Sequence, residues 1–203
     1  MSRFIAFAAH LVCASAVIKI ANIGDSITAG VCGSKGGYPT ILQTLLGGNY
    51  QVANFGNSGK TMLKYGGPGD SSYWNQTTWP AAQNFSADLY TILLGTNDAK
   101  VFNWFPCTGP TGEDDCSWVG GDNYTADYVE MISILKRQTP SPKVFIMSPP
   151  PLYPPNPYSM NKTVINAVIP ETILPSIAAS GVGCETEIID LFDALGGKAL
   201  NMT

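Results

Sequence analysis

The chain has 203 residues, of which 45% are hydrophobic and 13% charged, a composition typical of a single globular domain with a sizeable core. Its formal net charge of −4 offers no basic surface, which argues against nucleic-acid binding. No apolar run reaches the roughly 18 residues of a membrane-spanning helix, so we predict no membrane span.

The amino terminus has the pattern of a secretory signal peptide. A basic residue precedes an apolar run over residues 4–12, and Ala14 and Ala16 supply a small-x-small cleavage site. A buried first strand or helix, or an uncleaved anchor, would share the apolar run. We predict cleavage after Ala16, with residues 1–16 as signal peptide, residues 17–203 as the mature domain, and a secreted protein.

Two further features agree with export. Asn-x-Ser/Thr glycosylation sites exceed the about two expected by chance. They are Asn75, Asn84, Asn123, Asn161 and Asn201.

Without the signal peptide, an even number of cysteines remains, enough for two disulfides. They are Cys32, Cys107, Cys116 and Cys184. Cys107 and Cys116 flank a short loop and are the easiest pair, whereas Cys32 with Cys184 follows only by elimination, so the connectivity stays open. Neither the cysteine spacing nor the single histidine supports a zinc site. We predict neither a metal nor an organic cofactor.

Five segments have the apolar pattern of short strands. They are residues 18–23, 50–55, 87–94, 143–148 and 187–190. Helical patterns lie between them. They cover residues 38–46, a short stretch at 80–84, residues 124–135, and residues 164–177 with interruptions at Pro170 and Pro175. This alternation predicts an α/β fold in one domain, namely a doubly wound (flavodoxin-like) parallel five-stranded sheet with helices on both faces.

Three predicted strands end in short polar turns that contain glycine. These are Gly24-Asp25-Ser26, the Asn-Phe-Gly-Asn-Ser-Gly run at 54–59, and Gly-Thr-Asn-Asp at 95–98. In a parallel sheet, functional groups collect where strands end, and a serine there is a candidate nucleophile. Each turn taken singly is also ordinary turn chemistry. Their occurrence together, in this order, favours a catalytic site.

The three turns resemble the first three sequence blocks of the SGNH-hydrolase superfamily, the GDSL esterases and lipases, in order and spacing. The resemblance implies that Ser26 is the nucleophile that attacks an ester carbonyl. It also implies an oxyanion hole formed by the Ser26 N–H, the Gly56 N–H and the side-chain amide of Asn97. Gly56 is expected there because a side chain would obstruct the substrate oxygen.

Three charged residues accompany these turns. We predict that Asp25 braces its turn and is not an acid or base in the reaction. Asp98 and Lys100 are predicted to be solvated loop charges.

The same resemblance implies an Asp-x-x-His block near the carboxyl terminus, which would supply the base that activates Ser26. This sequence has no such block. Its single histidine, His10, lies in the predicted signal peptide, and neither Asp190 nor Asp193 has the required spacing. A carboxyl-terminal truncation and a shortened, inactive relative both explain the absence, and the intact first blocks favour truncation. In either case we expect little esterase turnover from residues 17–203.

The expected substrate is a small-molecule or carbohydrate ester. Predicted secretion, tryptophan-bearing loops and a glycine-rich oxyanion site look most like the carbohydrate O-acetylesterase branch of the superfamily. Trp74, Trp104 and Trp118 are candidates for stacking on sugar rings, although loop tryptophans also serve as core anchors. A lipase or thioesterase is the enzymatic alternative, and a glycan-binding pseudoenzyme the non-catalytic one. The sequence does not address the oligomeric state.

Overall fold

The computed structural model describes residues 16–31, 33–65, 71–104, 120–156, 158–185 and 187–200. Its centre is a parallel sheet with the strand order β2-β1-β3-β4. The strands are β1 (Ile18–Gly24), β2 (Tyr50–Gly56), β3 (Leu89–Leu93) and β4 (Lys143–Ile146). Gly24 pairs with Gly56 on one side and with Leu93 on the other, so the three motif turns begin at one edge of the sheet. The predicted α/β fold with a parallel sheet is confirmed.

The predicted fifth strand is wrong. Residues 187–190 run beside β4, but only Ile189 forms a bridge, to Met147. The side chain of Asp190 already caps the helix α7 (Leu191–Ala194). The chain therefore leaves the sheet after one paired residue, and the sheet has four strands among the described residues.

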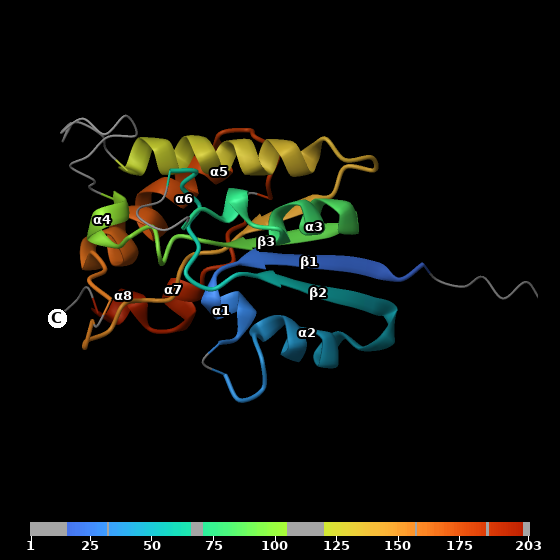
Figure 1. Cartoon of the computed structure of the whole chain (residues 1–203), viewed down its shortest axis with the longest axis horizontal. Helices are drawn as coiled ribbons and strands as arrows, with labels where there is room; N and C mark the ends of the chain where they lie inside the picture. The colour runs from blue at the N-terminus through green and yellow to red at the C-terminus, as the bar shows by residue number, and fades with distance from the viewer. Residues whose placement is uncertain are drawn as a thin grey trace, which may run out of the picture.

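Helices cover both faces of the sheet, with α3 and α5 on one side and α2 on the other (Figure 1). The helices besides α7 are α1 (Ser26–Ala29), α2 (Tyr38–Leu46), α3 (Thr78–Phe85), α4 (Val101–Trp104), α5 (Gly120–Lys136), the π-helix η3 (Val164–Ile173), α6 (Leu174–Ala179) and α8 (Gly197–Leu200). Two single turns of 3₁₀ helix, η1 (Gly47–Asn49) and η2 (Tyr73–Asn75), join them.

Two predicted helices show how glycine and proline set helix geometry. The helix over residues 38–46 is confirmed, and it ends where Gly47 adopts a φ of 73° that disfavours a side chain. The interruption predicted at Pro170 takes the form of the π-helix η3, whose wider turn contains the proline. Pro175 lies where α6 continues directly from η3, so both predicted prolines are contained within one continuous helical run.

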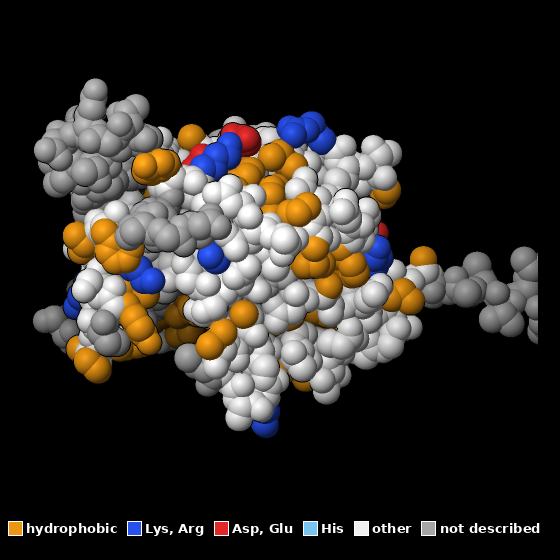
Figure 2. All heavy atoms as spheres, viewed as in Figure 1, with side chains coloured by type: hydrophobic (Ala, Val, Ile, Leu, Met, Phe, Trp, Pro, Cys, Tyr) orange, Lys and Arg blue, Asp and Glu red, His pale blue; other side chains and the backbone are white. Residues whose placement is uncertain are grey.

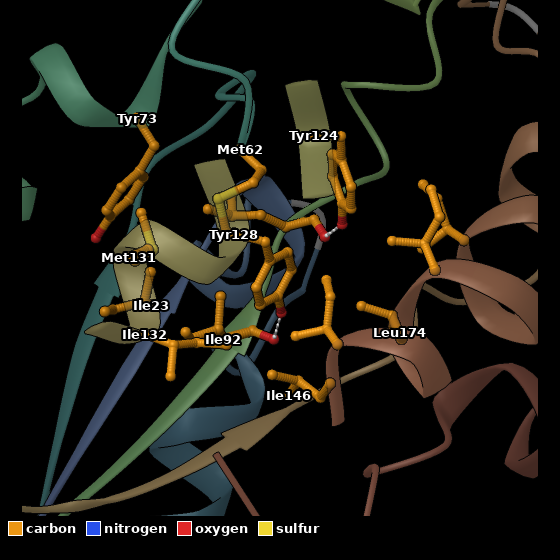
Figure 3. Packing of buried hydrophobic residues seen from close by; sticks show 14 of the residues in the cluster. Ile23, Met62, Tyr73, Ile92, Tyr124, Tyr128, Met131, Ile132, Ile146 and Leu174 are labelled. Atoms are coloured by element: carbon orange, nitrogen blue, oxygen red, sulfur yellow. Dashed lines mark hydrogen bonds between the residues drawn. The ribbon is translucent and has the colours of Figure 1, made fainter. Parts of the chain in front are cut away.

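The core lies between the sheet and the helices α3 and α5. Figure 3 shows Tyr124 and Tyr128 of α5 reaching the end of β3, where they donate to Leu94 O (2.8 Å) and Ile92 O (3.0 Å). Both tyrosines are fully buried, so these hydrogen bonds satisfy their hydroxyl groups and fix α5 across the strand end. The predicted apolar face of this helix is confirmed, because all four of its members are buried. They are Tyr124, Tyr128, Ile132 and Leu135.

The surface shown in Figure 2 carries few charged side chains, apart from a mixed group of both signs over α5. In the described part of the chain, no helix combines the length and the apolar character needed to cross a membrane.

Several predictions fall on residues outside the described ranges. These are the signal peptide up to residue 15, Cys32, the pair Cys107 and Cys116, Trp118, and the glycosylation site at Asn201. Cys184 is described and has a free thiol in the structure. Because Cys32 lies outside the described residues, its pairing with Cys184 stays a prediction.

Candidate active site

Ser26 is the first residue of α1 and directly follows the turn after β1. Asp25 caps this short helix, because its Oδ1 accepts a hydrogen bond from Ile27 N at 2.9 Å. Gly30, with a φ of 80°, closes the other end by donating to Ser26 O. The serine is partly exposed, whereas Asp25 is fully buried. A helix fixed at both ends thus presents Ser26 at the edge of the sheet, and the predicted bracing role of Asp25 agrees with its capping bond.

Two glycines allow α1 to pack directly on the strand ends. A Cβ atom at Gly56 would lie 2.2 Å from Ala29 N, and one at Gly24 would lie 2.0 Å from Thr28 Oγ1. Neither position can take a side chain unless α1 moves. The structure therefore gives a different reason for Gly56 than the expected clearance for a substrate oxygen.

The Gly56 N–H already has a hydrogen-bond partner in its own strand. It donates to Asn54 Oδ1 at 2.8 Å. The next residue, Asn57, donates its N–H to Gly24 O on β1. Successive N–H groups of an extended chain point to opposite sides, so the Gly56 N–H points to the open edge of β2. The expected role of Gly56 as an oxyanion donor is not supported by this hydrogen bond.

Asn97 lies beside the Ser26 turn and is 5% exposed. Its Nδ2 donates to Asp25 Oδ2 at 3.3 Å and to Lys60 O at 3.1 Å. Its backbone oxygen accepts a hydrogen bond from Asn103 Nδ2 at 2.7 Å. Asp25 belongs to the first motif turn, Lys60 directly follows the second, and Asn97 belongs to the third. The structure thus brings the three turns together at one polar junction.

Gly59 also belongs to this junction, although the sequence pattern did not predict a role for it. It precedes Lys60 in the turn after β2, has a φ of 78°, and has open space where a Cβ atom would be. Its N–H has no hydrogen-bond partner among the described residues. The sequence did show Gly59 as a second glycine in the same motif turn. Only the strand geometry tells which of the two glycines has an N–H without a partner among the described residues.

Two buried carboxylates, those of Asp25 and Asp98, lie in the motif turns of this junction. Asp98 is fully buried, and its two oxygens accept hydrogen bonds from Met62 N (3.0 Å) and Leu63 N (2.8 Å). Burial raises the pKa of Asp98 to about 7 and the pKa of Asp25 to about 6, although backbone N–H donors, and Lys100 near Asp25, act in the opposite direction. The prediction that Asp98 is a solvated loop charge is wrong.

A cavity of about 330 Å³ opens beside Ser26. Its walls are Ser26, Ile27 and Tyr38 together with the glycines at positions 30, 33, 36 and 37. The ring of Tyr38 is held in place by a hydrogen bond between its hydroxyl and Thr91 Oγ1, at 3.1 Å. The cavity gives a ligand room next to the serine, at the lower end of the volumes usual for small-molecule sites.

The described tryptophans serve packing. Trp104 is 3% exposed and packs against the Tyr124 ring, with ring centroids 5.6 Å apart, so it cannot stack on a sugar. Trp74 is half-buried, donates from Nε1 to Met62 O at 2.7 Å, and has the Lys64 ammonium 4.5 Å from its ring centre. Trp104 is therefore a core anchor, the second of the two roles considered for it, and Trp74 supports the loop after β2.

No described residue is a histidine. Within the same residues, no three His, Cys, Asp or Glu side chains are grouped closely enough to hold a metal ion. The carboxylate of Asp190 accepts hydrogen bonds from Ser148 Oγ (2.8 Å) and Asp193 N (3.0 Å) and so caps a helix. The described site therefore provides a serine and hydrogen-bond donors, with no imidazole to accept the serine proton.

Comparison with known proteins identifies relatives of this chain. The model of the GDSL-like lipase/acylhydrolase family matches residues 23–201. An acetylxylan esterase from Xylanibacter ruminicola is 32% identical over 173 residues, which covers 75% of this chain and 32% of that protein. The chain thus spans about a third of the length of this curated relative.

Solved structures agree on the fold. A putative arylesterase from Agrobacterium tumefaciens matches with a TM-score of 0.58 and 19% identity, covering 91% of this chain and 97% of the other. A carbohydrate acetylesterase family member from Sinorhizobium meliloti matches with a TM-score of 0.56 and 18% identity, covering 85% and 82% of the two chains.

Proposed function

This chain belongs to the GDSL-like lipase/acylhydrolase family, and we propose that it is a secreted serine ester hydrolase that deacetylates O-acetylated carbohydrates. The observation that carries the proposal is the position of Ser26. It stands partly exposed on a short helix at the sheet edge, beside a junction of polar groups from all three motif turns.

Ser26 is the proposed nucleophile. Its Oγ attacks the ester carbonyl carbon, the alcohol leaves with a proton, and water then releases the acetyl group from the serine. The N–H of Ser26 lies in the first turn of α1, where no carbonyl of the helix can accept it. This N–H is therefore available for the negative charge that develops on the carbonyl oxygen.

Asn97 and Gly59 are the other proposed donors. The longer of the two Asn97 bonds, the 3.3 Å bond to Asp25, is the one that a substrate oxyanion would replace. Gly59 is favoured over Gly56 because the Gly56 N–H is engaged at the open edge of β2. Loss of one such donor costs a hydrolase about 3 kcal/mol of transition-state stabilisation.

The rate is expected to be low, because no described residue is a histidine and a serine hydroxyl without a base is a weak nucleophile. A preformed oxyanion hole and substrate binding alone still accelerate acyl transfer by roughly 10³–10⁴ over water. The purified protein should therefore hydrolyse 4-nitrophenyl acetate slowly and in a manner that depends on Ser26.

The test compares Ser26→Ala with Ser141→Ala, which removes an exposed hydroxyl outside the site. We expect Ser26→Ala to abolish the protein-dependent rate and Ser141→Ala to leave it unchanged. Free imidazole should raise the rate of the wild-type protein by supplying the missing base, after subtraction of the reaction measured with Ser26→Ala. An undiminished rate in Ser26→Ala would refute the nucleophile assignment, and full hydrolase activity without imidazole would refute the expected need for a base.

The carbohydrate part of the proposal is supported by the relative at 32% identity, whose name is acetylxylan esterase. The cavity of about 330 Å³ beside Ser26 is larger than an acetyl group requires, so it has room for part of the alcohol that carries the acetyl group. Release of acetate from acetylated xylan, in preference to hydrolysis of 4-nitrophenyl octanoate, is the expected outcome.

A lipase or thioesterase is the alternative that the cavity walls favour, because Ile27 and the Tyr38 ring present carbon to a bound group. Preference for the octanoate ester would select it. A glycan-binding pseudoenzyme is favoured instead by the missing imidazole. Binding of acetylated xylan, measured by retardation in a native gel, without any Ser26-dependent acetate release would select the pseudoenzyme.

Secretion is supported by the signal-like pattern that ends at Ala16, two residues before β1 begins at Ile18. Asn75 and Asn84 are exposed and lie in glycosylation sites, so they are accessible to modification. The measurement is the amino-terminal sequence of the protein recovered from the medium of an expressing cell, which is expected to start at Val17.

A further inference from the structure

Asp98 joins one segment of the loop after β2 to the end of β3. We infer that it is a positioning residue that clamps residues 60–63, the clamp segment, onto the strand end and thereby sets Asn97 and Gly59 for the reaction. The inference deepens the proposed function and rests on it. It concerns a residue with no proposed contact to the substrate.

Two consecutive residues, Asn97 and Asp98, bind the clamp segment at three points. Asn97 Nδ2 donates to Lys60 O at 3.1 Å. The carboxylate of Asp98 accepts from Met62 N at 3.0 Å and from Leu63 N at 2.8 Å. Because both oxygens are used, the carboxylate fixes the position and the direction of the segment.

Burying the Asp98 carboxylate carries an energetic cost. Asp98 is 0% exposed, and the surface ion pair between Lys64 and Glu130 involves neither Asp98 nor its partners. The ionisable groups that act on Asp98 are Asp25 from the β1 turn and the hydroxyls of Tyr124 and Tyr128 from α5. None of them is a cation. A buried carboxylate without a cation is expensive, and an apolar residue would serve packing alone at lower cost.

The side chains and the backbone of the clamp segment are held in different ways. Met62 and Leu63 are both 0% exposed, and Figure 3 shows Met62 among Tyr124, Tyr128 and Met131. Hydrophobic packing therefore holds these side chains in place. The direction of the backbone, and with it the position of the preceding residues, depends on the Asp98 hydrogen bonds.

The consequence falls on Gly59, which directly precedes the clamp segment. Its unpartnered N–H is one of the proposed oxyanion donors, and the next carbonyl, that of Lys60, holds the Asn97 amide. Without the clamp, the Gly59 N–H and the Asn97 amide lose their common support. A change at Asp98 thus acts on both donors without touching the substrate.

Asp127 provides a matched control. Its Oδ2 accepts a hydrogen bond from Lys64 N at 2.8 Å, so a second carboxylate binds the same loop one residue further on. Asp127 lies on α5, is only partly buried, and has no hydrogen bond to Asn97. Asp127→Asn therefore removes a similar bond outside the clamp.

The test compares Asp98→Asn with Asp127→Asn in the full chain by NMR. In Asp98→Asn, the amides of Met62 and Leu63 should exchange with solvent about tenfold faster or more, as expected when a buried hydrogen bond is lost. The side-chain amide signals of Asn97 should shift as well. With 4-nitrophenyl acetate, kcat should fall about tenfold while KM stays unchanged, because only transition-state contacts are weakened. Asp127→Asn should show none of these changes.

Unchanged exchange and unchanged Asn97 signals in Asp98→Asn would overturn the inference, as would equal effects in Asp127→Asn. If Asp98→Asn does not fold, native-state amide hydrogen exchange of the wild-type protein, measured at increasing urea concentrations, tests the clamp instead. Met62, Leu63 and the Asn97 amide should then open together with one free energy, and independent opening overturns the clamp. Exchange does not need turnover, so a failure of the esterase proposal, seen as a rate independent of Ser26, is distinguished from a failure of the clamp.

Discussion

Two regions at the same edge of the sheet are held in different ways. At the ends of β1, β2 and β3, the connecting groups Asn97 and Asp98 are 5% and 0% exposed and bind backbone atoms of a distant loop. After β4, the connecting group Asp190 is exposed, and it caps a helix while accepting from Ser148 Oγ. Buried polar bonds cannot be exchanged for water without a large cost, whereas exposed ones can. The nucleophile and its donors therefore depend on the first region.

The largest effect is expected at the glycine on which α1 packs. Gly56→Ala places a Cβ atom 2.2 Å from Ala29 N, so the helix that carries Ser26 must move. We expect a loss of about 3 kcal/mol in the free energy of unfolding, measured by urea denaturation. Gly48→Ala is the control, because open space surrounds that position. A loss below 1 kcal/mol in Gly56→Ala would contradict the close packing of α1.

The second effect is a pH dependence of stability that comes from the first region. Asp98 has a pKa of about 7 when folded and 3.8 as its ordinary value, so the folded protein holds a proton that the unfolded chain releases. This contribution is complete below about pH 4 and is lost as the pH rises through about 7. Through Asp98 alone, the free energy of unfolding should thus fall by about 2.5 kcal/mol between pH 5 and 7.5.

Urea denaturation of Asp98→Asn at both pH values checks this sign. The variant should show a smaller fall than the wild-type protein, with the remainder coming from Asp25, whose pKa is raised to about 6. Glu187→Gln, which removes an exposed carboxylate, is the control. A wild-type protein that gains stability between pH 5 and 7.5 through Asp98 would contradict the raised pKa.

A smaller effect is expected in the second region. Asp190→Ala removes the cap of α7 and the acceptor for Ser148 Oγ, which should cost about 1 kcal/mol of stability. Because this region is not joined to the polar junction, the Asn97 side-chain signals in NMR should not move. A shift of those signals would show that the two regions are coupled and would remove the distinction between them.

The smallest effect is expected at the surface ion pair of Lys64 and Glu130, whose side chains are 40% and 52% exposed. Glu130→Gln should change the free energy of unfolding by less than about 1 kcal/mol, because exposed ion pairs gain little over hydration. Raising the salt concentration should have a similarly small effect on the wild-type protein. A loss as large as that of Gly56→Ala would mean that surface bonds support the site as strongly as buried ones.

The elements with strong local signals could be predicted from the sequence. The four confirmed strands are short segments rich in apolar residues and end at glycine or polar turns, and α2 ends at a glycine with a positive φ. The fifth strand was wrong because Ile189 is followed at once by Asp190, a capping residue, and local capping won over the short apolar pattern. Trp104 was ambiguous because the sequence does not reveal which face of a short helix is buried.

The sequence by itself determined that three polar turns follow three strands, that one of them carries Ser26, and that they resemble the blocks of an ester hydrolase. Only the tertiary structure decided which groups of those turns meet. The direction of the Gly56 N–H follows from the pairing of β2 with β1, and the burial of Asp98 follows from a loop folded over the end of β3. Hydrogen-bond direction and desolvation depend on neighbours distant in the chain, and for this reason no local pattern contains them.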